Sequence, residues 1–220
     1  MNPTVLFTVL ALSSPVTESP AQSLGSCTLS GTLTVVNPTG AAFEPDHAEV
    51  YVDTSLPVMP RQQEHLMRQK ERAFSPRILV VEKDDTVLFQ NEDREPHEIH
   101  ADKDKNTFVS GQNLKPETFR QAFQEVGESF LGCRIHAQMS GVILTVPNSF
   151  HAKVGPDRKW SISGLPHRPI DLVFWQHTGT ATVVERRRVT PCDTTTLEVT
   201  LRAAANTKAR PYGGVIKPTD

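Results

Sequence analysis

The chain has 220 residues, of which 37% are hydrophobic and 22% are charged, and its formal net charge is −2. This near-neutral balance argues against the broad basic surface that nucleic-acid binding requires, and there is no acidic tail. At this length a hydrophobic core can be buried without the help of a metal, so one large or two small domains are expected.

The N-terminal segment predicts export from the cell. The apolar run Val5–Leu12 is followed by a small-residue cleavage site, Ser19-Pro20-Ala21, so residues 1–21 are expected to be a signal peptide. No Lys or Arg precedes the apolar run, which leaves a disordered or edge-strand N-terminus as the alternative. Such a short run cannot span a bilayer and no other segment comes close, so we expect a periplasmic or secreted protein without a membrane span.

Short runs of β-branched and aromatic residues, broken by Gly, Pro, Asn and Asp, predict strands along most of the chain. In order they are Thr28–Val36, Glu49–Asp53, Arg77–Glu82, Thr86–Gln90, His97–Ala101, Glu117–Gln124, Glu128–Cys133, Val142–Val146, Lys159–Gly164, Asp171–Trp175, Thr182–Arg188 and Thr195–Arg202. Met59–Ala73 is rich in helix formers after Pro60 and instead predicts a helix. Many short strands without alternating helices indicate an all-β sandwich architecture.

Domain boundaries are expected near Ala73–Pro76 and Pro147–Ser149. Each flank supplies too few strands for a closed sandwich of its own, so we predict that the two flanks complete one β-sandwich together. The predicted division is a signal peptide over 1–21, the two parts of this sandwich over 22–58 and 148–205, a helical linker over 59–73, an inserted domain over 74–147 and a flexible tail over 206–220.

The three cysteines make an odd number. Cys27 lies near the predicted mature start and Cys192 lies just before the last strand-like run, so these two could pair in an oxidising compartment and staple the first strand to the last. Cys133 would then be left over, as a thiolate metal ligand requires. Three unrelated thiols remain the alternative.

The motif Cys133-x2-His136-x2-Met139 directly follows the apolar residues Phe130 and Leu131. A further histidine, His97, lies upstream beyond the predicted strand Thr86–Gln90. One thiolate, two imidazoles and a weak axial thioether form the ligand set of a type 1 copper site, because soft ligands suit the reduced ion and nitrogen donors suit both states.

Simpler interpretations exist for each of these residues alone. Cys133 by itself would be a small buried hydrophobe and Met139 core filling. Zinc is the rival metal because cysteine and histidine suit it, but the methionine argues against zinc. Taken together, His97, Cys133, His136 and Met139 predict one mononuclear type 1 copper site.

The pattern around these residues resembles the cupredoxins, and the short Cys-to-Met loop resembles the amicyanin type. A longer pattern is similar to plastocyanin-like proteins described as methylamine utilisation proteins; it runs through Phe74-Ser75-Pro76, Ile78–Val81, Val87-x-Phe89-x-Asn91-x-Asp93, His97, Gly132-Cys133-x-Ile135-His136-x-x-Met139-x-Gly141, Gly164-Leu165-Pro166 and Leu172-x-Phe174-Trp175-x-His177. The resemblance covers roughly residues 69–177. It implies a Greek-key cupredoxin sandwich associated with a second, immunoglobulin-like (carboxypeptidase regulatory-like) β-sandwich, and it implies that His97, Cys133, His136 and Met139 bind copper.

Two positions depart from this pattern. Many cupredoxins have Asn directly after the first histidine ligand, where this chain has Glu98, whose ionised carboxylate only accepts hydrogen bonds. Gln138 stands before the methionine where the family often has an aromatic residue. Both leave the ligands intact and bear on the reduction potential and the rigidity of the loop.

Other polar residues are weaker candidates. We interpret His100 as a rim residue rather than a fifth ligand, His177 as a surface histidine, and His151 and His167 as turn-associated histidines without a role. The run Arg186–Arg188, with Lys103 and Lys105 elsewhere, is either a docking patch for an acidic partner or solvated strand charge, and the second interpretation is preferred. We find no catalytic triad and no phosphate-cradling or dinucleotide-binding motif.

The sequence thus predicts an exported electron carrier that is not an enzyme. A dehydrogenase or reductase would deliver an electron through the rim around His136, and a cytochrome or oxidase would withdraw it. Ile135, Ala137 and Val142 would form the apolar patch where these partners dock. We expect a monomer without a nucleic-acid partner. The alternatives are a copper-handling protein without an electron-transfer role and a structural β-sandwich with a vestigial site.

Overall fold

The computed structural model describes residues 26–56, 61–101, 105–178 and 181–203. These residues form strands and no helix, which confirms the predicted all-β class. The strands are β1 (Cys27–Val36), β2 (Ala42–Phe43), β3 (His47–Val52), β4 (Glu64–Lys70), β5 (Ala73–Ser75), β6 (Ile78–Glu82), β7 (Thr86–Asn91), β8 (His97–Ala101), β9 (Phe108–Asn113), β10 (Thr118–Ala122), β11 (Gly127–Cys133), β12 (Ser140–Val146), β13 (His151–Lys153), β14 (Lys159–Leu165), β15 (Ile170–Thr178), β16 (Ala181–Val189) and β17 (Thr196–Arg202). The predicted signal peptide and flexible tail lie outside the described residues.

The helix predicted over Met59–Ala73 is wrong wherever the structure describes this segment. β4 runs parallel to β7, in a register that pairs Glu64 with Thr86 and Gln69 with Asn91. A short turn then leads into β5, which pairs back onto β4. Met67 is completely buried in a hydrophobic core that includes Phe89, so tertiary contacts outweigh the helix propensity of these residues.

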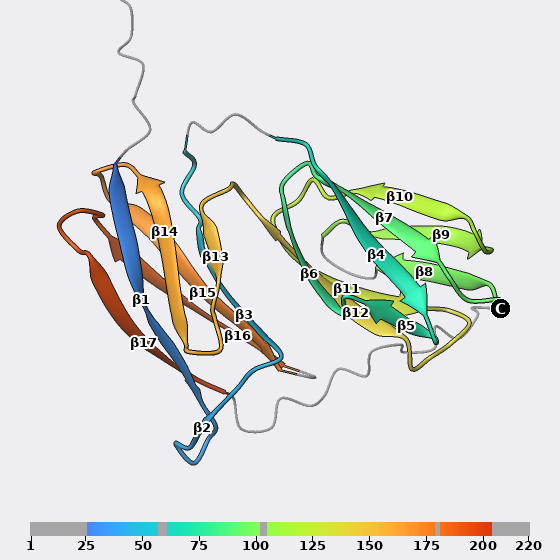
Figure 1. Cartoon of the computed structure of the whole chain (residues 1–220), viewed down its shortest axis with the longest axis horizontal. Helices are drawn as coiled ribbons and strands as arrows, with labels where there is room; N and C mark the ends of the chain where they lie inside the picture. The colour runs from blue at the N-terminus through green and yellow to red at the C-terminus, as the bar shows by residue number, and fades with distance from the viewer. Residues whose placement is uncertain (1–25, 57–60, 102–104, 179–180, 204–220) are drawn as a thin grey trace, which may run out of the picture.

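The strands between residues 64 and 146 form a two-sheet sandwich (Figure 1, labels β4 to β12). One sheet has the order β10-β7-β4-β5 and the other β6-β12-β11-β8-β9. Their facing side chains form one hydrophobic core, in which the fully buried Phe89 contacts Phe74 edge-on and Phe108 at a tilt. Cys133 and Met139 belong to this core.

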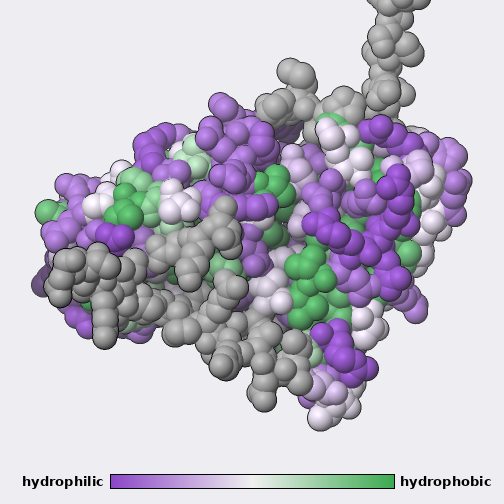
Figure 2. Space-filling view, turned by 180° about the vertical axis from the view of Figure 1, so that it is seen from behind, coloured by the Kyte–Doolittle hydropathy of each residue, from purple (hydrophilic) through white to green (hydrophobic). Residues whose placement is uncertain are grey.

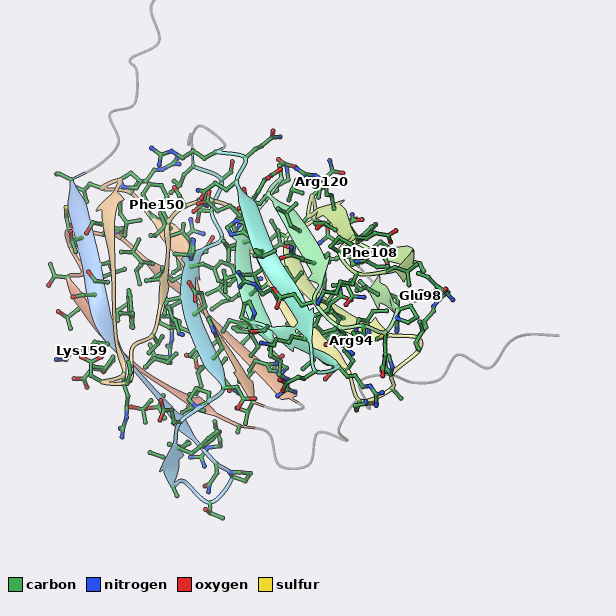
Figure 3. The ribbon with its side chains drawn as sticks, turned by 45° about the vertical axis from the view of Figure 1, so that its right-hand side comes forward. Arg94, Glu98, Phe108, Arg120, Phe150 and Lys159 are labelled. Carbon is green, nitrogen blue, oxygen red and sulfur yellow. A yellow bond between two sulfur atoms is a disulfide. The ribbon has the colours of Figure 1, made fainter. Side chains whose placement is uncertain are left out.

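The flanking strands form a second pair of sheets, drawn beside the first pair in Figure 1. β14, β1 and β17 form one sheet, with β2 at its side, and β13, β3, β15 and β16 form the other. The core between them includes the edge-on ring contact of Trp160 with Phe174. Because β1 pairs with both β14 and β17, the strands before and after the middle segment share a sheet. Figure 3 labels Phe150 among these sheets and Phe108 in the other sandwich.

A disulfide joins Cys27, at the start of β1, to Cys192, shortly before β17. The pairing considered from the sequence is therefore confirmed. Cys133 is the free cysteine among the described residues, and it is buried.

A third hydrophobic cluster joins the two sandwiches. Tyr51, Val173 and Trp175 of the flanking sheets pack against β12 residues that include Val142 and Leu144. The Trp175 indole also donates a hydrogen bond to Glu128 of β11. These contacts attach β15 to the sheet that carries Cys133.

His177 is buried rather than at the surface, contrary to the prediction, because its side chain lies beside Trp175 at this junction. The two rings stack with their centroids 6.0 Å apart, and Nδ1 lies 3.1 Å from the Thr182 hydroxyl. Burial, followed by the positive charge of Arg77, lowers the pKa of His177 from 6.5 to about 4. The folded protein therefore holds this imidazole in its neutral form above about pH 4.

We expect the His177→Gln variant to lose less stability on acidification than the wild type. The unfolded chain takes up a proton at His177 below about pH 6.5 and the folded chain does so only near pH 4, so folding loses up to about 3 kcal/mol between these values. Denaturant unfolding at a series of pH values measures this slope. His167→Gln is the matched control because His167 is exposed; equal slopes in the wild type and His177→Gln would contradict the prediction.

The described surface is mostly hydrophilic on the face shown in Figure 2, where hydrophobic residues are gathered in separate, smaller patches. Within the described ranges of the chain, the large hydrophobic side chains that remain exposed are Val109, Leu114, Ile135 and Val184. Among the described residues there is no helix of the length and apolarity that crossing a membrane requires.

Candidate metal centre

Three of the four predicted ligands meet at one end of the β4–β12 sandwich. His97 is the first residue of β8, Cys133 is the last residue of β11, and His136 lies in the loop between β11 and β12. β8 and β11 are neighbours, with Cys133 paired opposite Ile99, so the sheet itself brings the thiol next to His97. In the described part of the chain, these three residues form the one group of His, Cys and acidic side chains whose ligand atoms are close enough together to share a metal ion.

The distances within this group suit a small metal ion. The Cys133 Sγ atom lies 3.8 Å from His97 Nδ1 and 3.9 Å from His136 Nδ1, and the two Nδ1 atoms are 3.1 Å apart. A point equidistant from these three atoms lies about 2.1 Å from each, within the range of about 2.0–2.3 Å for metal bonds to imidazole nitrogen and thiolate sulfur. The residues present therefore fit a metal held by two imidazoles and one thiolate.

Met139, the fourth predicted ligand, lies in the loop just before β12. Its side chain is fully buried in the same hydrophobic core as Cys133. Its backbone N–H donates a hydrogen bond of 3.0 Å to the carbonyl of His136, which closes the Cys-to-Met loop into a tight turn. Met139 is thus built into the loop that carries His136, and its role as an axial ligand stays a prediction.

Asn91 organises the loop that leads into His97. Its amide donates hydrogen bonds to the carbonyls of Glu95 and Asn113, and its side-chain oxygen accepts one from the N–H of Asp93. The side chain is buried, so these bonds are sheltered from water. The last residue of β7 therefore sets the course of the chain towards the first ligand.

Asp93 binds the outer nitrogen of His97. Asp93 Oδ2 lies 2.9 Å from His97 Nε2, and the carboxylate also accepts the backbone N–H groups of Glu71 and Arg72 at 2.7 and 2.9 Å. Burial opposes ionisation of Asp93, but these hydrogen bonds outweigh it and lower its pKa. An ionised carboxylate only accepts hydrogen bonds, so this contact favours the His97 tautomer that has its proton on Nε2 and the lone pair of Nδ1 on the side of the metal position.

Glu95 is placed in a similar way beside His136. Glu95 Oε2 lies 3.1 Å from His136 Nε2, and Arg72 donates two hydrogen bonds to the same carboxylate. The hydrogen bond from Arg72 is the main cause that lowers the pKa of Glu95, and Glu95 in turn raises the pKa of Arg72. Both imidazoles therefore face Cys133 with Nδ1 and a carboxylate with Nε2.

The two positions that depart from the cupredoxin pattern lie at the edge of the site. Glu98 forms an ion pair of 3.3 Å with Arg134, and the Glu98 carbonyl accepts the Arg134 N–H, so the residue after His97 is tied to the residue after Cys133. Gln138 is exposed.

The structure corrects the interpretation of two other histidines. His100 is buried rather than at the rim, and its ring packs against Gly132 of the neighbouring strand β11. It lies so close to Gly132 that a Cβ atom there would approach His100 Nε2 to 2.6 Å, so the residue before Cys133 has to be glycine unless the ring moves. His151, for which no role was expected, lies 2.7 Å from the buried Glu49.

Glu49 connects two histidines on neighbouring strands. Its second carboxylate oxygen lies 2.9 Å from His47 Nε2. Burial raises the pKa of Glu49, but the hydrogen bonds with His151 and His47 outweigh this effect and lower it. This cluster stabilises the pairing of β3 with β13.

The structure supports solvated charge rather than a docking patch at Arg186–Arg188. Each of these arginines has an acidic partner, which is Asp53, Glu185 and Asp171 in turn. Lys103 lies outside the described residues. Lys105 donates a hydrogen bond to the Val126 carbonyl.

The predicted apolar docking patch is only partly present. Ile135 is 41% exposed and Ala137 is also exposed, so both border His136 at the surface. Val142 was wrongly included, because it is buried in the cluster that joins the two sandwiches.

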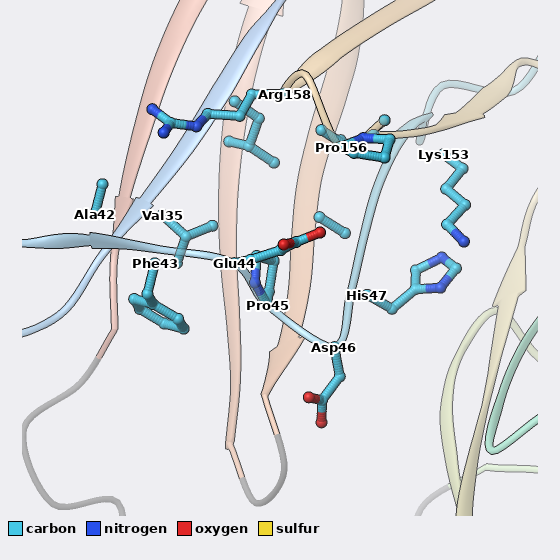
Figure 4. A pocket seen from close by; sticks show the side chains of 14 residues that line it. Val35, Ala42, Phe43, Glu44, Pro45, Asp46, His47, Lys153, Pro156 and Arg158 are labelled. Carbon is cyan, nitrogen blue, oxygen red and sulfur yellow. The ribbon is translucent and has the colours of Figure 1, made fainter.

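A separate pocket of about 380 Å³ lies in the other sandwich (Figure 4). Its lining contains apolar side chains together with the polar or charged side chains of Glu44, Asp46, His47, Lys153 and Arg158. None of the residues around this pocket belongs to the metal group.

The sequence pattern alone assigns no role to Asp93, Glu95 and Arg72. Asp93 belongs to the motif that carries the cupredoxin resemblance, and Arg72 lies in the predicted helix. Two acidic residues within four positions before a candidate histidine ligand were the available signal. Arg72 gave no signal, because it reaches the site through the pairing of β4 with β7.

Solved structures of cupredoxins match part of the chain, whereas no family model and no curated protein matches it. A reduced mutant form of amicyanin is 17% identical, with 44% of this chain and 97% of that chain covered and a TM-score of 0.36. A purple cupredoxin from Nitrosopumilus maritimus is 22% identical over 36% of this chain and 97% of that chain, with a TM-score of 0.33. A copper-containing nitrite reductase from Thermus scotoductus SA-01 is 22% identical over 43% of this chain and 25% of that chain, with a TM-score of 0.37. We base the functional proposal on the residues of the site.

Proposed function

We propose that this protein is an exported electron carrier with one mononuclear type 1 copper site, bound by His97, Cys133, His136 and Met139. The observation that carries the proposal is the convergence of two imidazole Nδ1 atoms and one thiol sulfur around a single point. Copper, when bound there, would supply reversible one-electron chemistry between its +1 and +2 states.

The scaffold holds these side chains in fixed positions. Cys133 and His97 stand on paired strands, and His97, Cys133 and Met139 are almost completely shielded from solvent. Ligand positions that do not change between oxidation states keep the reorganisation on electron transfer small, and a buried thiol is protected from unwanted oxidation. These properties suit a carrier.

Electrons would enter and leave through the ring of His136. Its side chain is 13% exposed, whereas that of His97 is fully buried. Ile135 and Ala137 flank it with exposed apolar surface, while Glu95 and Arg72 supply charge beside it. A redox partner would therefore contact both apolar and charged groups at this end of the sandwich.

Export to the periplasm or beyond is part of the proposal. The Cys27–Cys192 disulfide supports it, because such bonds persist in oxidising compartments and are rare in reducing ones. A dehydrogenase or reductase would load the carrier, and a cytochrome or oxidase would unload it. From the resemblance of residues 69–177 we also group the protein with the plastocyanin-like methylamine utilisation proteins.

The test is a titration of the purified protein with Cu(II). We expect saturation at one equivalent with an intense absorption near ~600 nm, the signature of a copper–thiolate bond, and a reversible redox wave. A colourless protein that binds Zn(II) tightly would contradict the proposal. Colour without a reversible wave would favour copper handling, and no metal binding at all would favour a structural role.

A further inference from the structure

We propose that the carboxylates of Asp93 and Glu95, held in place by the Glu71–Arg72 turn, are positioning residues that orient both imidazole ligands and lower the reduction potential of the site. The inference deepens the proposed function and rests on it, since it assigns the groups that tune the metal rather than those that bind it. Asp93, Arg94 and Glu95 lie in the loop between β7 and β8, at the end of the sandwich where Figure 3 labels Arg94.

Each of the two imidazole ligands has a carboxylate beside its outer nitrogen. His97 Nε2 lies 2.9 Å from Asp93 Oδ2, and His136 Nε2 lies 3.1 Å from Glu95 Oε2. A carboxylate that accepts the outer N–H of an imidazole fixes the orientation of the ring and makes its other nitrogen a stronger donor. One short loop therefore provides this support for both imidazoles of the site.

The turn between β4 and β5 holds both carboxylates. Glu71 and Arg72 have φ angles of 55° and 57°, the left-handed conformation of a two-residue hairpin turn that favours glycine or asparagine. In this conformation the backbone N–H groups of both residues point at Asp93. The Arg72 side chain meanwhile reaches Glu95, so a single residue contacts both carboxylates.

The two carboxylates are not expected to contribute equally. The Asp93 side chain is 16% exposed and is fixed by two backbone donors, whereas the Glu95 side chain is 45% exposed. Solvent screens the charge of an exposed group and weakens its hydrogen bonds. The effect of Asp93 on the site should therefore be the larger one.

The sign of the effect follows from charge. A negative carboxylate on the outer nitrogen of a ligand favours the more positive state of the ion, Cu(II), over Cu(I). Removing that charge while keeping the shape of the side chain should weaken Cu(II) binding relative to Cu(I) and raise the potential.

The experiment compares Asp93→Asn and Glu95→Gln with the wild type in the full chain. We expect Asp93→Asn to lower the affinity for Cu(II) about 10–100-fold relative to Cu(I). Each tenfold change raises the potential by about 59 mV in a one-electron couple. Glu95→Gln should move both quantities in the same direction by less. Asp193→Asn is the matched control, because it removes a carboxylate from an exposed His–Asp pair that contains no predicted ligand, and it should change neither.

A measurement on the metal-free protein separates this inference from the proposed function. In the wild type, the Nε2–H proton of His97 should give a downfield, slowly exchanging NMR signal. This signal should move upfield in Asp93→Asn, because an amide is a weaker acceptor than a carboxylate. A wild-type His97 protonated at Nδ1, or a signal and potential unchanged in Asp93→Asn, would overturn the inference while leaving a blue copper protein intact. A wild type that gives no blue site but shows the shifted signal would overturn the proposed function and the effect on the potential, and would leave only the orientation of His97 by Asp93.

Discussion

Replacing Cys133 with serine should abolish the intense visible absorption of the copper-loaded protein. The band comes from charge transfer between a thiolate and the metal, and a hydroxyl group cannot replace the thiolate. Serine is close to cysteine in size, so the fold should persist, with a loss of about 1–3 kcal/mol for placing a hydroxyl in a hydrophobic core. Absorption spectra of the variant in the presence of copper test the loss of the band, and circular dichroism tests whether the fold persists.

Met139→Gln is the matched control for this experiment. It changes a second fully buried residue of the same loop, and its amide oxygen can occupy the weak axial position that a glutamine fills in some blue copper sites. We therefore expect the colour to remain and the potential to move. A blue Cys133→Ser variant would refute the assignment of the thiolate, and an unchanged potential in Met139→Gln would refute the axial role of Met139.

Removing the Cys27–Cys192 disulfide should destabilise the protein by about 2–5 kcal/mol. The bond joins residues 165 positions apart in the sequence, so it restricts the unfolded chain strongly. It also ties β1 to the segment before β17, its parallel neighbour in the sheet. Denaturant unfolding of the metal-free Cys27→Ala/Cys192→Ala protein measures the loss.

Reductant provides the control for this second prediction. Reduction of the metal-free wild type should lower its stability to that of the double variant, and reductant should leave the double variant unchanged. The copper site should still form in the variant, because its ligands lie in the other sandwich. Equal unfolding midpoints for the oxidised wild type and the double variant would contradict the prediction.

Some strands were predictable because their pattern is local. His97–Ala101 was predicted with the bounds that β8 has, and Thr28–Val36 lies within β1. Strands with weak patterns were missed, among them β9, where Gly111 interrupts a polar run, and the three-residue β13. In these strands the pairing of neighbouring backbones, rather than the composition, determines the structure.

The candidate ligands themselves could be read from the sequence, because their residue types and spacing carry the chemistry. The thiol, the thioether and one imidazole lie within seven residues, 133–139, and the turn closed by the hydrogen bond from Met139 to His136 keeps this segment compact. The positions of Cys27 and Cys192 near the first and last strands likewise suggested a pairing that leaves Cys133 free, with three unrelated thiols as the alternative, and the structure confirms the pairing.

The surroundings of the ligands were decided by tertiary structure alone. Arg72 and Asp93 are 21 positions apart, and they meet because β4 runs parallel to β7, in a segment whose composition favours a helix. His100 and His177 are buried by strands and rings that lie far away in the sequence. Residue type and spacing thus determined which groups can bind a metal. The pairing of distant strands decided which charges face these groups. The sequence could not show this pairing, because a contact between two distant segments leaves no pattern in the sequence of either segment.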